Sequence, residues 1–286
     1  MKILLTGATG QVGYELERSL QACGTVVAPP RAVADLADAG RLRAVVRAVR
    51  PTLIVNAAAY TAVDRAESEP ALAWRINAEA PAVLAEEARA LGAAMVHFST
   101  DYVFDGSKAA PYTETDTPAP LNVYGQSKLA GEQAVAAAGI AHLILRTSWV
   151  YGMRGNNFLL TMLRLARTQG ALRVVADQRG APTWSRTIAD KTAHLLGLAQ
   201  AGGHPWWDQH SGLYHLACQG QTSWHGFAEA IMAGAGLACP VAPIASADYP
   251  QAARRPANAL LDCDKLISRF GPLPDWEQAL ILCLAP

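Results

Sequence analysis

The alternation of short apolar runs with amphipathic segments over the first 150 residues most constrains how this 286-residue chain can fold. The runs have the length of buried strands, and the segments between them carry apolar residues at helical spacing. Strands that alternate with helices over short connections form βαβ units, so we predict an α/β fold with a doubly wound parallel sheet. The expected strands are 2–7, 25–30, 52–59, 93–100 and 141–152, and the expected helices are 11–24, 39–51, 70–92 and 127–139.

Three glycines, Gly7, Gly10 and Gly13, join the first expected strand to the first expected helix. In this context the first glycine permits a sharp turn, the second lets the backbone approach a pyrophosphate, and the third lets helix and strand pack closely. Free N–H groups at the helix start, in the segment with Gln11 and Val12, then face the anion. The loop therefore predicts a Rossmann-type sheet that binds a nicotinamide dinucleotide.

The end of the second expected strand leaves the choice of dinucleotide open. Asp35, with Leu36 beside it, stands at a spacing from the glycine loop that suits a ribose-binding carboxylate. Arg31 can instead bind the 2′-phosphate that NADPH carries and NADH lacks. We expect that NADPH is accepted, and the preference over NADH stays open.

The regular alternation of expected strands and helices becomes less clear after Tyr151. Helical spacing recurs over 156–170 and 186–203, and strand-like runs over 171–177 and 212–220. We therefore predict an NAD(P)-binding Rossmann domain over 1–150 and a smaller mixed α/β domain over 151–286, mainly for substrate binding. Segments such as 171–176 and 213–218 can return to the first sheet.

Charge and composition exclude several kinds of partner. The chain has 24 basic and 24 acidic residues without a long run of either sign, which argues against nucleic acid or an acidic membrane surface. No apolar run approaches the roughly 18 residues of a membrane span, and the N-terminal run is too short for a secretory signal. We expect a cytoplasmic protein.

Neither the cysteines nor the histidines suggest a metal site. The five cysteines are scattered without a Cys-x-x-Cys pair, so we expect free thiols. Four histidines cluster in the sequence without zinc-site spacing, and we expect them in loops and on the surface. They are His204, His210, His215 and His225.

Tyr124 and Lys128 stand four residues apart at the start of an expected helix, so their side chains share one helical face. Thr100 and Asp101 stand at the carboxyl end of the fourth expected strand. Ligands of open parallel sheets bind beyond the carboxyl ends of the strands. We therefore expect these groups to face the cofactor.

The glycine motif together with Tyr-x-x-x-Lys resembles the extended short-chain dehydrogenase/reductase superfamily. Five strings in order resemble its dTDP-4-dehydrorhamnose reductase family, and the similarity runs from Met1 to about Leu266. The strings are "NAAAYTAVDRAESEP", "HFSTDYVFDG", "PLNVYGQSKLAGE", "RTSWVYG" and "RRPANALLD". The resemblance implies an enzyme that reduces the C4 ketone of dTDP-4-dehydro-L-rhamnose to dTDP-L-rhamnose with NADPH, the last step of dTDP-rhamnose synthesis.

Reduction of a ketone needs a hydride on carbon and a proton on oxygen, which gives the residues their expected roles. Tyr124 is the expected proton donor, and the ammonium of Lys128 is expected to lower its pKa. The resemblance implies that Lys128 also bonds the nicotinamide ribose and that Thr100 donates a second hydrogen bond to the carbonyl oxygen. It further implies Ala57, Ala58 and Ala59 beside the cofactor, and Thr61, Val63, Tyr102, Trp149 and Arg255 around the dTDP-sugar.

One departure from the family concerns a metal. Some members dimerise through a divalent ion held by acidic side chains, and Glu15 matches one of those positions. Arg186 stands where another acid is expected, and a cation there opposes metal binding. We expect no metal dependence, and a monomer or a weak homodimer.

Two other functions stay open. One is another nucleotide-sugar epimerase, dehydratase or reductase of the extended family. A dehydratase would carry an Asp-Glu pair after the catalytic threonine, whereas this chain has Asp101–Tyr102. The other is a non-catalytic, NADP-binding regulatory subunit on the same fold, against which the intact Thr100, Tyr124 and Lys128 argue.

Overall fold

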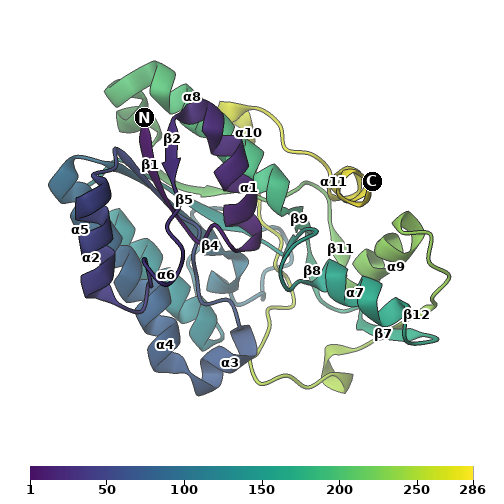
Figure 1. Ribbon diagram of the computed structural model, residues 1–286. Helices are drawn as coiled ribbons and strands as arrows, with labels where there is room; N and C mark the ends of the chain where they lie inside the picture. The colour runs from purple at the N-terminus through teal and green to yellow at the C-terminus, as the bar shows by residue number, and fades with distance from the viewer. Residues whose placement is uncertain (286) are drawn as a thin grey trace.

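The computed structural model describes residues 1–285, and a six-stranded parallel sheet forms its centre (Figure 1). The strand order is β10–β5–β4–β3–β1–β2, and each neighbouring pair runs parallel. The sheet is doubly wound, because the chain leaves β1 for β2 on one side and returns to β3 on the other. The strands are β1 (Lys2–Thr6), β2 (Thr25–Val27), β3 (Leu53–Asn56), β4 (Ala94–Thr100), β5 (His142–Thr147) and β10 (Gly212–His215).

Helices cover both faces of this sheet, which confirms the predicted α/β architecture. Side chains alternate along each strand, so Ile3 and Leu5 of β1 join one apolar cluster and Leu4 joins the other. The first face carries α1 (Gln11–Ser19), α8 (Ser185–His210) and α10 (Asp264–Phe270). The second carries α2 (Ala39–Val49), α5 (Ala80–Leu91) and α6 (Val123–Ala137).

Short elements connect these layers. Between β3 and α5 the chain forms α3 (Val63–Ser68), α4 (Pro70–Trp74) and a π-helical turn, Arg75–Glu79. Short 3-10 turns follow α1 at Leu20–Cys23 and β4 at Asp101–Val103 (η3). The helix expected over 70–92 is therefore formed by three consecutive stretches: α4, the π-helical turn and α5.

A smaller lobe lies on the right of Figure 1 and has its own apolar cluster, with Tyr151, Phe227 and Trp276 among its buried members. Its helices are α7 (Phe158–Ala166), α9 (Trp224–Gly234) and α11 (Trp276–Leu284). Its two-stranded sheets pair β7 (Leu172–Val175) with β12 (Val241–Ile244), β6 (Val150–Tyr151) with β9 (Thr183–Trp184), and β8 (Arg179–Gly180) with β11 (Thr222–Ser223). A 3-10 turn, η4, spans Ser246–Asp248.

Only one of the two segments expected to return to the central sheet does so. The run at 213–218 contributes β10, which pairs with β5 at the edge of the sheet. The run at 171–176 does not return, because β7 pairs with β12 in the smaller lobe. Leu172 and Val174 are buried while Arg173 is exposed, a pattern that suits a strand with one solvent face rather than a central parallel strand.

The prediction that the four clustered histidines lie in loops is wrong, because all four belong to helices or a strand, and only His204 among them is exposed. His215 is fully buried in β10, and burial lowers its pKa to about 3. His204 and His210 belong to α8, and His225 belongs to α9. The expected helix at 186–203 matches the first part of α8. At Gly203, with φ of 61°, the backbone leaves the helical conformation, and a second helical stretch follows to His210.

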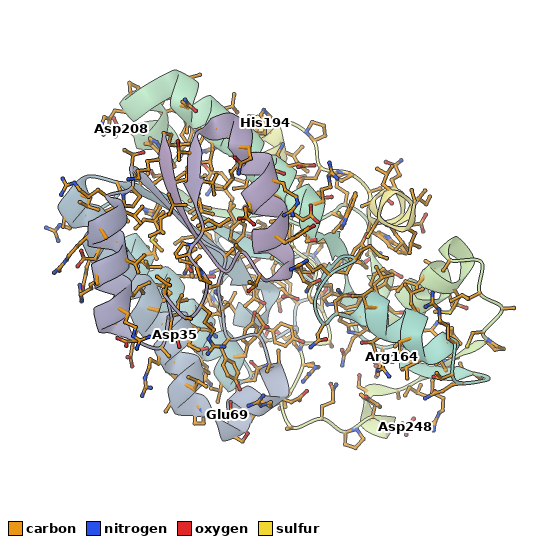
Figure 2. The ribbon with its side chains drawn as sticks, in the orientation of Figure 1. Asp35, Glu69, Arg164, His194, Asp208 and Asp248 are labelled. Carbon is orange, nitrogen blue, oxygen red and sulfur yellow. The ribbon has the colours of Figure 1, made fainter. Side chains whose placement is uncertain are left out.

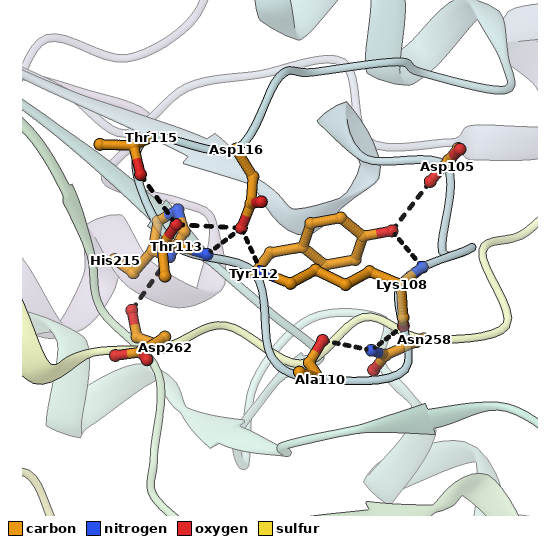
Figure 3. A network of polar contacts seen from close by, with 10 residues as sticks. All are labelled: Asp105, Lys108, Ala110, Tyr112, Thr113, Thr115, Asp116, His215, Asn258 and Asp262. Carbon is orange, nitrogen blue, oxygen red and sulfur yellow. Dashed lines mark hydrogen bonds and ion pairs between the residues drawn. The ribbon is translucent and has the colours of Figure 1, made fainter.

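A polar network fixes the segment 105–116 against the chain near its C-terminal end (Figure 3). The hydroxyl of Tyr112 donates to Asp105 Oδ1 at 2.8 Å, and Lys108 pairs with Asp116 at 2.6 Å. Asn258 Nδ2 donates to the carbonyl oxygen of Lys108 at 2.7 Å. Segment 105–116 follows η3, so this network fixes the chain directly after the residues at the end of β4.

None of the helices described has the length and apolarity that crossing a bilayer requires.

Candidate active site

The glycine loop forms one wall of a cavity of about 710 Å³ at the carboxyl ends of β1 and β3. Gly7 adopts φ of 76°, which glycine reaches without strain. A Cβ on Gly13 would stand 2.0 Å from the carbonyl oxygen of Gly7, so only glycine lets α1 approach the turn this closely. Gly10, Gln11 and Val12 line the cavity, whereas Gly13 packs behind the turn.

The cavity continues along the ends of β2 and β3. It is lined there by Ala57, Ala58 and Ala59 after β3, and by Arg31, Asp35 and Leu36 after β2. Arg31 Nε lies 3.7 Å from Asp35 Oδ1, and the arginine side chain is largely exposed. Asp35, labelled in Figure 2, also accepts a hydrogen bond from the backbone N–H of Ala37 at 3.0 Å. Arg31 and Asp35, the candidates for binding the 2′-phosphate or the ribose of the adenosine, therefore lie together as an ion pair.

Tyr124 and Lys128 project from the first turns of α6, and local contacts fix where this helix begins. The side chain of Asn122 caps it by accepting a hydrogen bond from Gly125 N–H at 2.8 Å. A Cβ on Gly125 would stand 2.2 Å from the carbonyl oxygen of Tyr102, so the glycine lets α6 pack directly on η3. The rings of Tyr102 and Tyr124 then meet edge to face, with centroids 5.5 Å apart.

The environments of Tyr124 and Lys128 differ from the expected one. Lys128 Nζ donates to the carbonyl oxygen of Phe98 at 2.6 Å, and burial lowers the lysine pKa to about 8. Burial raises the pKa of Tyr124 to about 12, and the nearby hydroxyl of Thr100 only partly opposes this. The expectation that Lys128 brings the tyrosine pKa down is therefore wrong, because desolvation dominates and the ammonium is directed to Phe98.

Asp101, which was expected to face the cofactor but was given no role, is buried next to Thr100. The hydroxyl of Thr100 donates to Asp101 Oδ1 at 2.8 Å, and the hydroxyl of Ser148 donates to Asp101 Oδ2 at 3.2 Å. Burial raises the pKa of Asp101 to about 7, although these hydrogen bonds favour its ionised form. The sequence places Asp101 at a strand end, but nothing in the sequence reports its desolvation.

A second cavity, of about 720 Å³, adjoins the first and extends into the smaller lobe. Thr100, Asp101 and Tyr124 line it, and Tyr124 lines the first cavity as well. The residues expected around a dTDP-sugar all line this second cavity: Thr61, Val63, Tyr102, Trp149 and Arg255. The cofactor candidates and the substrate candidates thus meet at Tyr124.

Trp149 and Arg255 are both held in place by neighbours. Trp149 has φ of 46°, an uncommon conformation for a bulky residue, and stacks on Trp224 with ring centroids 3.6 Å apart. Arg255 makes a two-point contact with Asp64 of α3, at 3.0 and 2.7 Å. Sequence reasoning missed Trp224 and Asp64, which come from elements far apart in the chain.

The segment between β6 and α7 contributes residues to both cavities, and sequence reasoning missed two of its residues, Arg154 and Asn157. Asn157 Nδ2 donates to Gln11 Oε1 at 2.8 Å, which ties this segment to the glycine loop. Arg154 lines the first cavity, and its guanidinium lies 4.2 Å from the ring centre of Tyr14 on α1. The flanking glycines in "YGMRGNN" hint at a loop, but not at its position over the cofactor cavity.

Residues 1–285 contain no cluster of three or more acidic, histidine or cysteine side chains suited to a metal ion. Arg186 pairs with Asp190 at 3.6 Å within α8, and Asp190 also accepts a hydrogen bond from Ser19 at 2.6 Å. The carboxylate of Asp190 is therefore paired with the arginine and bonded to the serine.

The first cavity fits a nicotinamide dinucleotide. Its glycine turn has no side chain where a pyrophosphate would approach, and its floor is made of small alanines. Within residues 1–285, the buried hydroxyls of Ser99 and Thr147 have no hydrogen-bond partner, and both residues line the two cavities near Tyr124. Unpartnered buried hydroxyls are uncommon, and a polar ligand at this junction would satisfy them.

Comparisons with known proteins agree with this geometry. The family model described as RmlD substrate binding domain matches residues 1–286. The chain is 52% identical to a dTDP-4-dehydrorhamnose reductase of Burkholderia thailandensis, with 99% of this chain and 98% of the relative covered. It is 46% identical to the Escherichia coli K12 enzyme of the same name, with 97% and 95% covered.

A crystal structure of dTDP-4-dehydrorhamnose reductase from Bacillus anthracis in complex with NADP superposes with a TM-score of 0.92. It is 35% identical in sequence, and the match covers 99% of this chain and 98% of that one. The similarity extends over both lobes rather than over the nucleotide-binding sheet alone. The chain therefore belongs to the RmlD family, together with the dTDP-4-dehydrorhamnose reductases to which it is similar.

Proposed function

We propose that this chain reduces the C4 ketone of dTDP-4-dehydro-L-rhamnose to dTDP-L-rhamnose with NADPH, the last step of dTDP-rhamnose synthesis. One observation carries the proposal: Tyr124 lines both the glycine-loop cavity and the cavity of the smaller lobe. A hydroxyl at this junction can reach a ketone in one cavity while a nicotinamide occupies the other. The names of the similar enzymes, and the NADP complex of one of them, support this substrate and cofactor.

In this proposal Tyr124 is the general acid that protonates the C4 oxygen. The hydroxyl is protonated at neutral pH. Burial raises its pKa to about 12 and makes it a weaker acid than free tyrosine, so it donates as negative charge develops on the C4 oxygen. Thr100 donates a second hydrogen bond to the oxygen as negative charge develops there, an interaction whose loss typically costs roughly 10²–10³ in rate. Lys128 holds a positive charge at the base of the site, on the carbonyl oxygen of Phe98.

NADPH supplies the hydride when it is bound, and the residues of the first cavity hold it. The N–H groups at the start of α1 face the pyrophosphate, and Arg154, which also lines the cavity, adds a positive charge. Arg31 binds the 2′-phosphate at the end of β2, while Asp35 holds the arginine and its neighbour Leu36 lines the wall. NADH fits the same cavity without the contact to Arg31.

The second cavity binds the dTDP-sugar. Thr61, Val63 and Tyr102 line its sugar end beside Thr100, and Trp149 is fixed by its stack on Trp224. Arg255 meets the diphosphate from a position set by Asp64. We assign cofactor binding mainly to 1–150 and substrate binding mainly to 151–286, with the residues after β3 and β4 shared between the two tasks.

Location and assembly complete the proposal. All five cysteines are free, four of them buried, which suits a reducing cytoplasm. The ion pair of Arg186 with Asp190 favours a monomer or a weak homodimer over one bridged by a metal.

The test is to mix the protein with dTDP-4-dehydro-L-rhamnose and NADPH and follow the nicotinamide absorbance. The proposal predicts consumption of NADPH that requires the sugar nucleotide. An absence of turnover with this substrate, in protein that binds NADPH, would favour a non-catalytic binding role.

A further inference from the structure

The single hydroxyl hydrogen of Thr100 is already engaged in this structure. Thr100 Oγ1 accepts a hydrogen bond from the N–H of Tyr102 at 3.1 Å and donates its own hydrogen to Asp101 Oδ1 at 2.8 Å. A hydroxyl has one hydrogen and two lone pairs. While this hydrogen points at a carboxylate, Thr100 has none to offer to a ketone oxygen.

The surroundings of Asp101 make its protonated form accessible. Asp101 is 2% exposed, and no arginine or lysine side chain within residues 1–285 bonds to its carboxyl group. Its polar neighbours are the hydroxyls of Thr100 and Ser148 and the backbone N–H groups of Asp101 and Tyr102. All of these favour the ionised form, but burial outweighs them and raises the pKa to about 7. The titratable groups that face it are Tyr124 from α6 and Tyr102 from η3, with the Arg255–Asp64 pair beyond Tyr102.

We propose that Asp101, in its protonated form, is the positioning residue that turns the Thr100 hydroxyl toward the substrate oxygen. Protonated Asp101 donates from Oδ1 to Thr100 Oγ1, whose second lone pair still accepts from the N–H of Tyr102. Both lone pairs are then used, and the Thr100 hydrogen is free to point into the substrate cavity that Thr100 lines. When Asp101 is ionised, the Thr100 hydroxyl donates to its carboxylate again. The inference rests on the proposed reduction and adds to it a control over the second hydrogen bond.

The direction of the pH effect follows from this switch. The productive form carries the proton on Asp101, so kcat/KM for the sugar nucleotide at saturating NADPH falls as pH rises through the pKa of about 7. A group with this pKa is protonated roughly ten times more at pH 6 than at pH 8. We therefore expect a decline of roughly tenfold over this interval.

Asp101→Asn tests the switch, because a carboxamide reproduces the productive arrangement at every pH. Its NH₂ group donates to Thr100 while its oxygen accepts from Ser148. The decline centred near pH 7 disappears, and the remaining alkaline limb begins at about 8, where Lys128 loses its charge. Asp101→Ala cannot accept the Thr100 hydrogen, so the decline near pH 7 disappears there too. It also has no donor to hold the Thr100 hydroxyl in its productive orientation, so its kcat/KM at pH 6 falls below that of the Asn variant.

Two results with the Asn variant would overturn the inference. One is a decline that still has its midpoint near 7. The other is a folded, NADPH-binding variant whose kcat/KM at pH 6 is as low as that of the Ala variant, since the carboxyl group itself would then be needed.

Ser148→Ala is an independent test that does not alter the carboxyl group. The Ser148 hydroxyl stabilises the ionised form of Asp101 and lowers its pKa. Removing it raises that pKa, so the decline moves to higher pH; an unmoved or acid-shifted decline contradicts the inference even if Asp101→Asn fails to fold. The unmodified protein separates this result from the proposed function, because a parent that does not consume NADPH with the sugar nucleotide disproves the reduction itself.

Discussion

At the scale of single residues, burial pushes the two central groups toward their neutral forms. It raises the pKa of Tyr124 to about 12 and lowers that of Lys128 to about 8. A tyrosine that keeps its proton is suited to donate it to a developing oxyanion. A lysine with a lowered pKa loses its charge as pH rises through about 8, so the positive field of the site weakens in alkaline solution.

Replacing Tyr124 with Phe keeps the ring that packs on Tyr102 and removes the proton donor. We expect turnover to fall by roughly 10²–10⁴-fold, the usual contribution of general acid catalysis. NADPH binding, measured by fluorescence titration, stays close to the parent value because the glycine loop is untouched. Turnover near that of the parent would contradict the role of Tyr124.

Arg31 and Arg154 both line the cofactor cavity, so their alanine variants form a matched pair. Arg31→Ala should weaken NADPH binding by roughly tenfold or more and leave NADH nearly unchanged, because only NADPH carries the 2′-phosphate. Arg154→Ala should weaken both cofactors alike, since both contain the pyrophosphate. Dissociation constants for the two cofactors with each variant decide this. Equal losses for both cofactors with Arg31→Ala would remove Arg31 from the phosphate site.

At the scale of elements, the site depends on two close approaches between a helix and a turn. α1 lies on the glycine turn at Gly13, and α6 lies on η3 at Gly125. Each approach brings helix N–H groups or side chains to the carboxyl ends of the strands. A side chain at either glycine would push its helix away from the turn on which it packs, next to the cavities for the ligands.

Gly13→Ala tests the first approach. The added Cβ would stand 2.0 Å from the carbonyl oxygen of Gly7, so α1 must shift. We expect a loss of roughly 1–3 kcal/mol in stability, the usual cost of overpacking, together with weaker NADPH binding. Gly197→Ala is the control, because this exposed glycine of α8 has no atom within 4 Å of the added Cβ. Thermal melts should show stabilisation there of roughly 0.5–1 kcal/mol. Equal melting temperatures for Gly13→Ala and the parent would refute the packing argument.

The elements that could be predicted from the sequence are those whose pattern is local. The apolar runs before Gly7 and Thr100 are buried on both faces, so the central sheet was predictable, and the motif glycines placed the cofactor cavity. The partner of β7 was not, because pairing with β12 joins segments about 70 residues apart. The state of Asp101 was not predictable either, since its pKa depends on burial by elements that the sequence does not show to be neighbours.

At the scale of the whole molecule, two lobes meet over the junction of the two cavities (Figure 1). Two contacts link the lobes: Asn157 donates to Gln11, and Arg255 pairs with Asp64. The separation of cofactor and substrate cavities gives the reaction its geometry, with Tyr124 between them.

The assembly prediction concerns Mg²⁺. Arg186 carries a positive charge and pairs with Asp190, so the surface of α8 offers a poor ligand set for a divalent ion. We expect the molar mass from light scattering and the rate of NADPH oxidation to be the same with EDTA and with added Mg²⁺. A dimer that dissociates on chelation and loses activity with it would show that Arg186 does not decide the matter.

The central claim is that a hydride passes from the nicotinamide to C4 of the sugar. It is tested most directly with NADPH carrying deuterium at the transferable position of C4 of the nicotinamide, and dTDP-4-dehydro-L-rhamnose. The account predicts one deuterium at C4 of the dTDP-L-rhamnose formed, detected by NMR and mass spectrometry, in amounts equal to the NADPH consumed. Conversion of the sugar nucleotide without deuterium at C4, or without net consumption of NADPH, would contradict it.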